Sequence, residues 1–581
     1  MMKRNRIYTR IAGMAVAVLA IVGCSDTWDD HYQAGQSGDI VGSTLWEVIE
    51  NDDQLSNFAR VLRETNYQKA LASSQVFTVF APTNDAFTEA DADDIIALYQ
   101  SEKNVKEKDK RAIKEFVQNH IALYNHSVAT TGEDSVVMMN GKYLVLTPEK
   151  LADSPLLTTN LLTKNGLLFT LGKKVDYQGN VFETIQSDSD LDSLGNFIAA
   201  FNEYEFMASA SVAGGIEDGR TWYLDSVTVL TNDMFAYTDY INSEDSVFWM
   251  VAPTNSVWKE LVDEYIPYFN YDNDVMKRDS LSWVRPRLAI LSGTVFNQTR
   301  NAKLQGDEYV WNRDSAMSVN AVDYNTRRYM WGRSDMKYYQ YDKPFDEGGA
   351  YIGTREIDCS NGKVIVADQW NIDKRETFFR EILVEAEDRT YFDKVDEATT
   401  NPLTYYSIES WSPFYNKVSN NRYALVRPKD NYSDVWFKLP SLLSNIGYDI
   451  YMVFVPVDAV DSLATDHKST TFQAAISYHT QDGKESPFYS MPVNTEIDYM
   501  DENDIHNYVV DPYKVDTVLI VSDYKFPTCS WGLSDPQVRL YLKSDYRRTA
   551  KQYGTLRDDY TGLMRIDCIL IKPHEESAEE Q

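Results

Sequence analysis

The fold of this chain is decided by residues 76–87, VFTVFAPTNDAF, which recur as residues 247–258, VFWMVAPTNSVW. Each copy predicts a buried strand that ends at a proline, because proline cannot donate a ladder hydrogen bond. The Thr-Asn pair that follows is typical of a helix N-cap. We expect Phe87 and Trp258 to anchor that helix in the core. The repeat therefore predicts two copies of one strand–turn–helix unit.

A second shared segment precedes each block. Residues 45–49, LWEVI, recur as residues 181–185, VFETI, and acidic residues follow in both copies. With three inserted residues in the second copy, Asn57-Phe58 then aligns with Asn196-Phe197. The apolar residues recur at helical spacing, so each copy is expected to open with two short amphipathic helices.

Each copy closes on an Asn-Gly pair. Asn165-Gly166 precedes the apolar residues 167–169, and Asn361-Gly362 precedes residues 363–366. Asn-Gly is a favoured tight-turn pair, so a terminal strand is expected after each turn.

These blocks resemble the fasciclin (FAS1) family, whose hallmarks are a TVFAPTNDAF segment and a terminal strand after Asn-Gly. The first copy matches almost letter for letter, whereas the second is longer, with inserted residues such as 324–346. His120 matches the family's central His, although Asn119 replaces the usual Tyr, and no His lies between His126 and His467. The resemblance implies two α+β domains, a buried structural role for His120, and adhesion through protein or glycan contacts.

The last third of the chain is rich in strands. Short β-type runs with polar connections predict an antiparallel sandwich of jelly-roll type; they cover residues 381–387, 435–440, 448–456, 472–478, 515–521, 538–542 and 564–571. The opening VEAE and closing RIDCILIKP runs are similar to carbohydrate-binding β-sandwich modules, in which the first and last strands pair. The expected fold class is thus two α+β FAS1 domains in tandem followed by an all-β antiparallel jelly-roll-type sandwich.

The N-terminus has the features of a lipoprotein signal. Basic residues precede an apolar run, residues 11–22, that is too short to span a bilayer comfortably. The run ends in Ile21-Val22-Gly23-Cys24, which resembles a bacterial lipobox and implies lipidation of Cys24; a plain secretory signal is the alternative. The stretch 25–30, which contains three aspartates, resembles the export signal of Bacteroidetes lipoproteins, which implies an outer-membrane protein exposed on the cell surface.

The expected organisation has six parts. They are a signal peptide (1–23), a lipidated tether (24–40), a FAS1-like domain (41–178), a divergent FAS1-like domain (179–373), a β-sandwich (374–575) and an acidic tail (576–581).

Charge and motifs narrow the function classes. A formal net charge of −32 over 581 residues opposes binding to nucleic acid. Of the four cysteines, Cys529 and Cys568 allow either a bridge or two buried thiols, and no zinc spacing is present. Asp498, Asp501, Glu502 and Asp504 predict either an oxygen-ligated calcium site or a solvated acidic loop. No catalytic motif is found, so we expect no catalytic residues, no metal and no cofactor.

Aromatic residues make up 13% of the chain and supply the candidate binding residues. Trp411, Phe414 and Tyr415 lie in a predicted loop, and Trp531 lies in a turn-like segment. Aromatic rings stack on sugar faces, so these residues predict a glycan-binding surface; core packing is the alternative.

The expected function is that of a non-catalytic cell-surface lipoprotein. We expect it to bind a polysaccharide or peptide, or to support assembly, beside a TonB-dependent transporter and its substrate-binding lipoprotein. An adhesin that binds host or matrix proteins through its FAS1 domains is one alternative. An extracellular glycoside hydrolase is another, because 88 acidic residues guarantee many carboxylate pairs.

Overall fold

The computed structural model separates into two compact units, Met1–Gln178 and Gly179–Gln581, and each is described by itself. The described residues are 42–105, 110–128, 132–207, 212–217, 220–225, 228–272, 280–298, 302–305, 308–311, 315–317, 329–330, 333–334, 340–394, 404–428, 432–491, 506–533, 535–545, 554 and 557–574.

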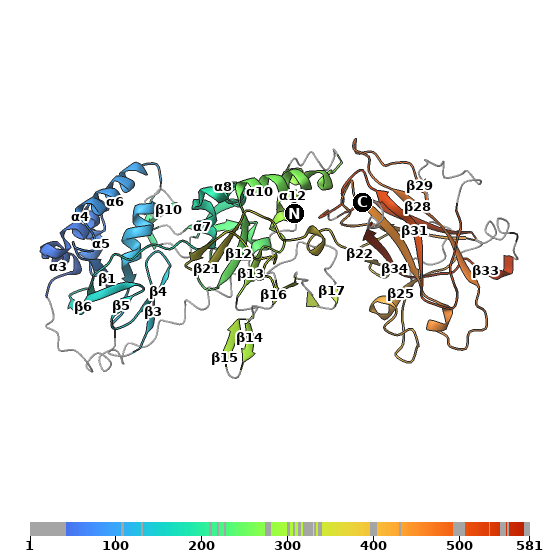
Figure 1. The fold of residues 1–581 in the computed structure, drawn as a ribbon, viewed down its shortest axis with the longest axis horizontal. Helices are drawn as coiled ribbons and strands as arrows, with labels where there is room; N and C mark the ends of the chain where they lie inside the picture. Colours follow the sequence, from blue (N-terminus) through green and yellow to red (C-terminus); the bar gives the residue numbers. More distant parts are fainter. Residues whose placement is uncertain are drawn as a thin grey trace. The chain divides into compact units, whose positions relative to one another are not determined.

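The first unit contains a seven-stranded sheet of order β2-β1-β7-β6-β5-β4-β3 with helices packed on one face (Figure 1). Its strands are β1 (Phe77–Pro82), β2 (Ile121–Leu123), β3 (Asp134–Val137), β4 (Tyr143–Leu146), β5 (Lys150–Leu151), β6 (Ser154–Thr163) and β7 (Gly166–Leu171). Its helices are α3 (Leu45–Asn51), η2 (Asp53–Leu55), α4 (Ser56–Glu64), α5 (Gln68–Leu71), α6 (Glu89–Ser101), η4 (Ala112–Val117) and η5 (Gln118–His120). Every residue of β1 is buried: Val79 faces the helices and Phe80 faces a second cluster on the opposite side of the sheet.

The second unit begins with a smaller sheet of order β13-β12-β21-β20, which repeats the order β2-β1-β7-β6 of the first unit. Its strands are β12 (Phe248–Pro253), β13 (Val295–Asn297), β20 (Arg355–Cys359) and β21 (Gly362–Ala367). The helices are α7 (Val181–Ser187), η6 (Ser189–Leu191), α8 (Asp192–Ala199), α9 (Phe235–Thr238), α10 (Asn255–Tyr265), η7 (Ile266–Phe269) and α12 (Ser280–Leu291). Two-stranded sheets pair β8 (Asn202–Phe206) with β11 (Thr228–Asn232), β9 (Val212–Glu217) with β10 (Arg220–Asp225), β14 (Ala302–Gln305) with β15 (Glu308–Trp311), β16 (Ser315–Met317) with β19 (Gln340–Asp342), and β17 (Tyr329–Met330) with β18 (Arg333–Ser334).

The two predicted opening helices are present in each copy, but the predicted three-residue insertion between them is wrong. The buried residues of α4 are Phe58, Ala59, Val61 and Leu62, and those of α8 are Leu194, Gly195, Phe197 and Ile198. The two sets keep one constant offset, so Phe58 corresponds to Leu194 and Val61 to Phe197. Matching the Asn-Phe pairs by residue identity gave the wrong alignment, because the buried face of each helix fixes which residues of α4 and α8 correspond.

The predicted capping role of the Thr-Asn pair is wrong in the first copy, and in the second it holds for position alone, since Thr254 is the N-cap residue of α10. Helix α6 begins after Thr88, which forms a capping box with Asp91, and the side chain of Thr254 makes no capping hydrogen bond to α10. Instead the asparagine braces the helices. Asn84 accepts from the Asn57 amide at 3.1 Å, and Asn255 accepts from the Ser193 amide at 2.7 Å.

Phe87 and Trp258 fulfil their predicted role in the core, with exposures of 0% and 5%.

The C-terminal region is a sandwich of two antiparallel sheets. One has the order β24-β25-β34-β27-β31 with β22 paired to β34, and the other has the order β23-β26-β32-β28-β29 with β30 and β33 paired to β28. All of these pairings are antiparallel except that of β28 with β33. The strands are β22 (Ile382–Glu385), β23 (Phe392–Lys394), β24 (Thr404–Ser407), β25 (Arg422–Val426), β26 (Tyr432–Lys438), β27 (Gly447–Phe454), β28 (Ser469–Ser477), β29 (Tyr489–Ser490), β30 (Tyr508–Val509), β31 (Asp516–Lys525), β32 (Arg539–Asp545), β33 (Tyr560–Thr561) and β34 (Met564–Pro573). Short 3-10 turns are η9 (Lys374–Glu376), η10 (Ser419–Asn421), η11 (Val457–Ala459) and η12 (Arg557–Asp559).

The predicted fold class is confirmed: α+β fasciclin architecture precedes an all-β antiparallel sandwich. The expected pairing of first and last sandwich strands is confirmed as well, with Ile382 opposite Ile571.

Candidate functional site

The predicted aromatic loop joins β24 to β25 and is open to solvent. Trp411 is 56% exposed and Tyr415 is 40% exposed. Phe414 is half-buried and packs on a small apolar cluster that includes Val418 and Leu425. The structure therefore offers two of the three aromatic side chains to a ligand and uses the third to hold the loop.

Buried carboxylates beneath this loop fix its position. The Ser419 amide donates to both carboxylate oxygens of Asp567, at 3.0 and 3.2 Å. The Ser419 hydroxyl and the Asn420 amide group donate to Glu385, at 2.5 and 3.0 Å. Asn420 has a φ of 51°, a left-handed conformation that asparagine tolerates. The end of the loop, just before β25, is therefore held by hydrogen bonds to buried acidic side chains.

Two carboxyl groups of this cluster, Asp567 and Glu387, have raised pKa values. Burial, opposed by the hydrogen bond from the Ser419 amide and reinforced by the charges of Glu385 and Glu387, raises the pKa of Asp567 to about 8. Burial and the charge of Glu385 raise the pKa of Glu387 to about 7. At neutral pH the Asp567 carboxyl therefore retains its proton, which reduces the repulsion within the cluster.

Trp531 does not belong to a ligand surface, so this predicted binding residue is wrong. Its side chain is 1% exposed and lies between the sandwich and the fasciclin-like region of the second unit. The ring packs edge-on against Phe269 at 5.3 Å, and the guanidinium of Arg285 lies 5.5 Å from its centroid. Tyr271 donates to the Trp531 carbonyl at 2.8 Å. The turn-like sequence around Trp531 suggested exposure, but apolar residues far away in the chain bury its ring.

The cysteine alternatives are resolved in favour of free thiols. Cys529 and Cys568 are both buried and unbridged. Burial raises the pKa of Cys529 to about 12, so this thiol stays protonated.

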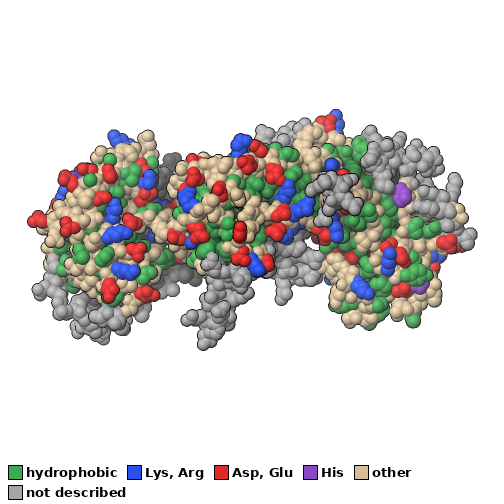
Figure 2. Space-filling view, in the orientation of Figure 1, with side chains coloured by type: hydrophobic (Ala, Val, Ile, Leu, Met, Phe, Trp, Pro, Cys, Tyr) green, Lys and Arg blue, Asp and Glu red, His purple; other side chains and the backbone are tan. Residues whose placement is uncertain are grey.

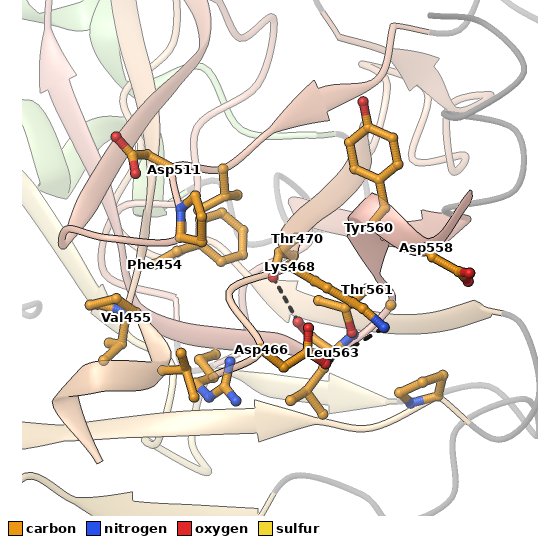
Figure 3. A pocket seen from close by; sticks show the side chains of 17 residues that line it. Phe454, Val455, Asp466, Lys468, Thr470, Asp511, Asp558, Tyr560, Thr561 and Leu563 are labelled. Atoms are coloured by element: carbon orange, nitrogen blue, oxygen red, sulfur yellow. Dashed lines mark hydrogen bonds and ion pairs between the residues drawn. The ribbon is translucent and has the colours of Figure 1, made fainter. Parts of the chain in front are cut away.

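A pocket that the sequence did not indicate opens at the end of the sandwich (Figure 3). Its volume is about 380 Å³, and it lies among the end of β27, the start of β28, β33 and β34. In Figure 3, Phe454, Val455 and Asp511 lie on one side, and Asp558 and Tyr560 lie on the other. Thr470 donates to the Leu563 carbonyl at 2.8 Å, which ties β28 to the segment before β34. The residues come from distant segments, so no local motif could reveal the pocket.

The pocket is lined by charged groups of both signs. Lys468 lies 3.5 Å from Asp466, and Asp511 lies 3.7 Å from Lys514, which is outside the lining. Arg565 lines the pocket from β34. Such a mixture of carboxylates and cations provides acceptors and donors for a polar ligand.

An exposed aromatic residue adjoins the pocket lining. Tyr513 is 64% exposed and directly follows the lining residues Asp511 and Pro512. Its ring stacks on His467 with centroids 4.9 Å apart and an interplanar angle of 19°. His467 is in turn held by Asp458 at 2.8 Å. An exposed ring with a fixed orientation next to a polar pocket suits a sugar face.

The fasciclin His120 has the buried role that the resemblance implied. It is fully buried, and its Nε2 accepts from the Val175 amide at 3.0 Å. Its Nδ1 therefore donates to the Phe116 carbonyl at 2.8 Å. Burial lowers the pKa of His120 to about 4, so the ring is neutral at physiological pH.

Some predictions fall outside the part of the chain that the structure describes. These are the lipidation of Cys24 and the acidic cluster of Asp498, Asp501, Glu502 and Asp504. Within the described residues, no group of three or more His, Cys, Asp or Glu side chains is arranged to hold a metal ion. Nor does any helix in those residues have the length and apolar character required to cross a bilayer.

Both signs of surface charge are distributed over each unit. On the face drawn in Figure 2, acidic and basic side chains are interspersed and do not form one large patch.

The family comparison identifies one domain. The Fasciclin domain family matches residues 53–173, so this part of the first unit is a fasciclin (FAS1) domain. No curated protein matches the chain.

Several solved structures are similar to parts of this chain. One is a FAS1 domain pair from the insect cell adhesion molecule Fasciclin I, with 13% identity, coverage of 57% of this chain and 97% of that chain, and a TM-score of 0.17. Another is the xylan-binding domain from CBM 22, with 12% identity, coverage of 33% and 92%, and a TM-score of 0.18. A third is the C-terminal family 22 carbohydrate binding module of Clostridium thermocellum Xyn10B, with 12% identity, coverage of 32% and 96%, and a TM-score of 0.16. These scores are too low to transfer a ligand to this chain.

Proposed function

We propose that this chain is a non-catalytic, lipid-anchored protein of the bacterial cell surface that captures a glycan with its C-terminal sandwich. In this role it serves as an accessory of an outer-membrane uptake system. The pocket of about 380 Å³ with Tyr513 beside it carries the proposal. It combines polar groups for sugar hydroxyls with a flat ring for a sugar face.

The charge pairing in the pocket supports binding over catalysis. Asp466 and Asp511 are each within ion-pair distance of a lysine. A glycosidase needs a protonated acid beside a second free carboxylate, whereas each of these two carboxylates lies beside a lysine. Ion-paired carboxylates of this kind can accept hydrogen bonds from the hydroxyl groups of a sugar.

The decisive experiment is a pull-down of the tagged, lipidated protein from mildly solubilised outer membranes, followed by mass spectrometry. We expect stoichiometric recovery of a TonB-dependent transporter and its substrate-binding lipoprotein. The cargo of that transporter would identify the ligand class. Recovery of background proteins alone would reject the uptake role.

Adhesion through the first unit is a second candidate, because one face of its outer hairpin is apolar and exposed. Val137, Tyr143 and Val145 are 43%, 45% and 47% exposed, and Val137 lies directly opposite Tyr143. Exposed apolar strips of this kind mark protein contacts. Substitution of Tyr143 and Val145 by serine should abolish adhesion to host matrix if this face is the adhesive surface. Unchanged adhesion would exclude it.

A further inference from the structure

Arg565 is a half-buried cation on the face of β34 that carries the pocket, away from the sandwich core. Its neighbours Met564 and Ile566 are both 0% exposed and belong to the core. Because successive strand residues point to opposite faces, Arg565 lies on the face that carries the pocket. Burial lowers the pKa of Arg565, while Tyr423 opposes this shift and the charge of Arg427 adds to it. A guanidinium nevertheless stays protonated in proteins.

No counterion accompanies this guanidinium among the described residues. The ion pairs of the pocket's described residues join Asp466 to Lys468 and Asp511 to Lys514, and neither includes Arg565. The remaining lining carboxylate, Asp558, is exposed. Leaving a half-buried charge without a partner is unfavourable, and an anion supplied by a ligand would offset that cost.

We propose that the pocket binds the anionic group of an acidic saccharide, a carboxylate or a sulfate, and that Arg565 receives this group. The inference rests on the proposed function and names its ligand class. The planar guanidinium can donate two parallel hydrogen bonds to either group. Lys468 adds a second cation to the same lining.

The carboxylates of the lining orient the saccharide. They repel a second anion and accept hydrogen bonds from hydroxyl groups, so the ring presents its acidic group to Arg565 and its hydroxyls to Asp466 and Asp511. Tyr513 provides a surface for the adjoining ring. With a net charge of −32, the whole chain repels polyanions, so affinity for one must come from a local cationic site.

The test measures the affinity of the full chain for two pairs of polymers, each of which joins a charged polymer to its neutral counterpart of the same backbone. The first pair is polygalacturonate and its fully methyl-esterified form, and the second is dextran sulfate and dextran. We expect binding to at least one charged polymer and at least about tenfold weaker binding to its neutral counterpart, as for the loss of one charge-assisted contact. The two pairs distinguish a carboxylate ligand from a sulfate ligand.

Variants assign the effect to Arg565. Arg565→Met should weaken binding of the charged polymer about tenfold or more, with Arg565→Lys intermediate because it retains charge but loses the planar fork. Arg422→Met, an exposed change on the neighbouring strand β25, serves as the control and should bind like the wild type. The unfolding midpoint of each variant verifies that it folds.

Three outcomes are decisive. Selective binding of a charged polymer that Arg565→Met weakens supports the inference. Equal binding of charged and neutral polymers, or an Arg565→Met variant that binds as tightly as Arg422→Met, overturns the inference and leaves glycan capture standing. Failure to bind any of the four polymers, or a wider panel of neutral glycans, overturns the glycan-binding function itself.

Discussion

The two fasciclin-like copies share the same asparagine hydrogen bonds between their first helix and last strand, but their apolar cores differ in which residues they include. Asn165 accepts from the Leu45 amide and Asn361 accepts from the Val181 amide, both at 2.8 Å. Each asparagine also donates to at least two backbone carbonyl groups in the segment before the central strand. The motif therefore encodes one junction, at which the first helix, the last strand and the central strand meet.

Beyond that junction the copies diverge. The apolar clusters of the first copy consist of residues from the first unit alone. The core of the second copy is continuous with the sandwich through Phe269, Phe378 and Trp531. Within the same segment Asn270 accepts from the Cys529 amide at 2.7 Å. Residues outside the motif thus decide whether a copy closes on itself or shares its core with a neighbouring fold.

The largest effect is expected at the two glycines of the junction. A Cβ at Gly166 would lie 1.9 Å from the Phe77 carbonyl oxygen, and one at Gly362 would lie 1.7 Å from that of Phe248. Each alanine variant should lose more than about 4 kcal/mol of unfolding free energy. Calorimetry should assign the loss in Gly166→Ala to the first unit. In Gly362→Ala the sandwich should unfold together with the fasciclin-like region. A sandwich transition that stays at the wild-type temperature would contradict the shared core.

Trp531→Ala tests the shared core directly. Removing a fully buried indole should cost about 3 to 5 kcal/mol. Both parts of the second unit should lose stability, whereas the first unit should unfold as in the wild type. Trp411→Ala, at an exposed indole, is the matched control and should change the midpoint little. An unfolding change confined to the sandwich would show that the ring serves only one side of the core.

The two units should respond to pH in opposite directions. The pKa of His120 is lowered to about 4 from 6.5, so its contribution to stability is present above pH 6.5 and is lost as pH falls through 4. The pKa of Asp567 is raised to about 8 from 3.8, so its contribution is present below pH 3.8 and is lost as pH rises through 8. The effect is on the order of 3 kcal/mol for His120 and is larger for Asp567, whose pKa shift is larger. Asp567→Asn should remove much of the alkaline loss of the second unit in thermal unfolding measured from pH 4 to 9. An unchanged slope would contradict the raised pKa.

The smallest effect is expected at the paired asparagines. Asn165→Ala and Asn361→Ala each leave a buried amide and two carbonyl groups without their partners, which should cost about 2 kcal/mol. Equivalent losses in the two copies, measured by denaturant unfolding, would support one common junction. A much smaller loss in the second copy would mean that the sandwich contacts compensate there.

The sequence was informative wherever neighbouring residues carry the signal. Asn-Gly before an apolar run predicted β7 and β21, because a tight turn requires residues that tolerate left-handed backbone. The prediction from sequence failed at the Thr-Asn pair of the first copy, which does not cap a helix, and at the three-residue insertion, which is absent. The capping hydrogen bonds at α6 come from Thr88 instead, and the helix register follows the buried face.

The candidate site was predictable only in part. The exposed Trp411 and Tyr415 lie in a loop of polar and small residues, as their sequence neighbours indicated. Trp531 has similar neighbours but is buried by Phe269, which lies far away in the chain. Local composition can identify a loop, but it cannot identify the distant residue that covers it.

The sequence by itself determined the repeated fasciclin junction and the order of α+β and all-β regions, because those depend on strand periodicity, turn residues and short motifs. Only the tertiary structure decided that the second copy shares its core with the sandwich, and that Arg565, Lys468 and Tyr513 gather at one end of it. The physical reason is that both features depend on contacts between residues far apart in the chain. Burial and charge pairing at such contacts are properties of the folded arrangement, which no local pattern records.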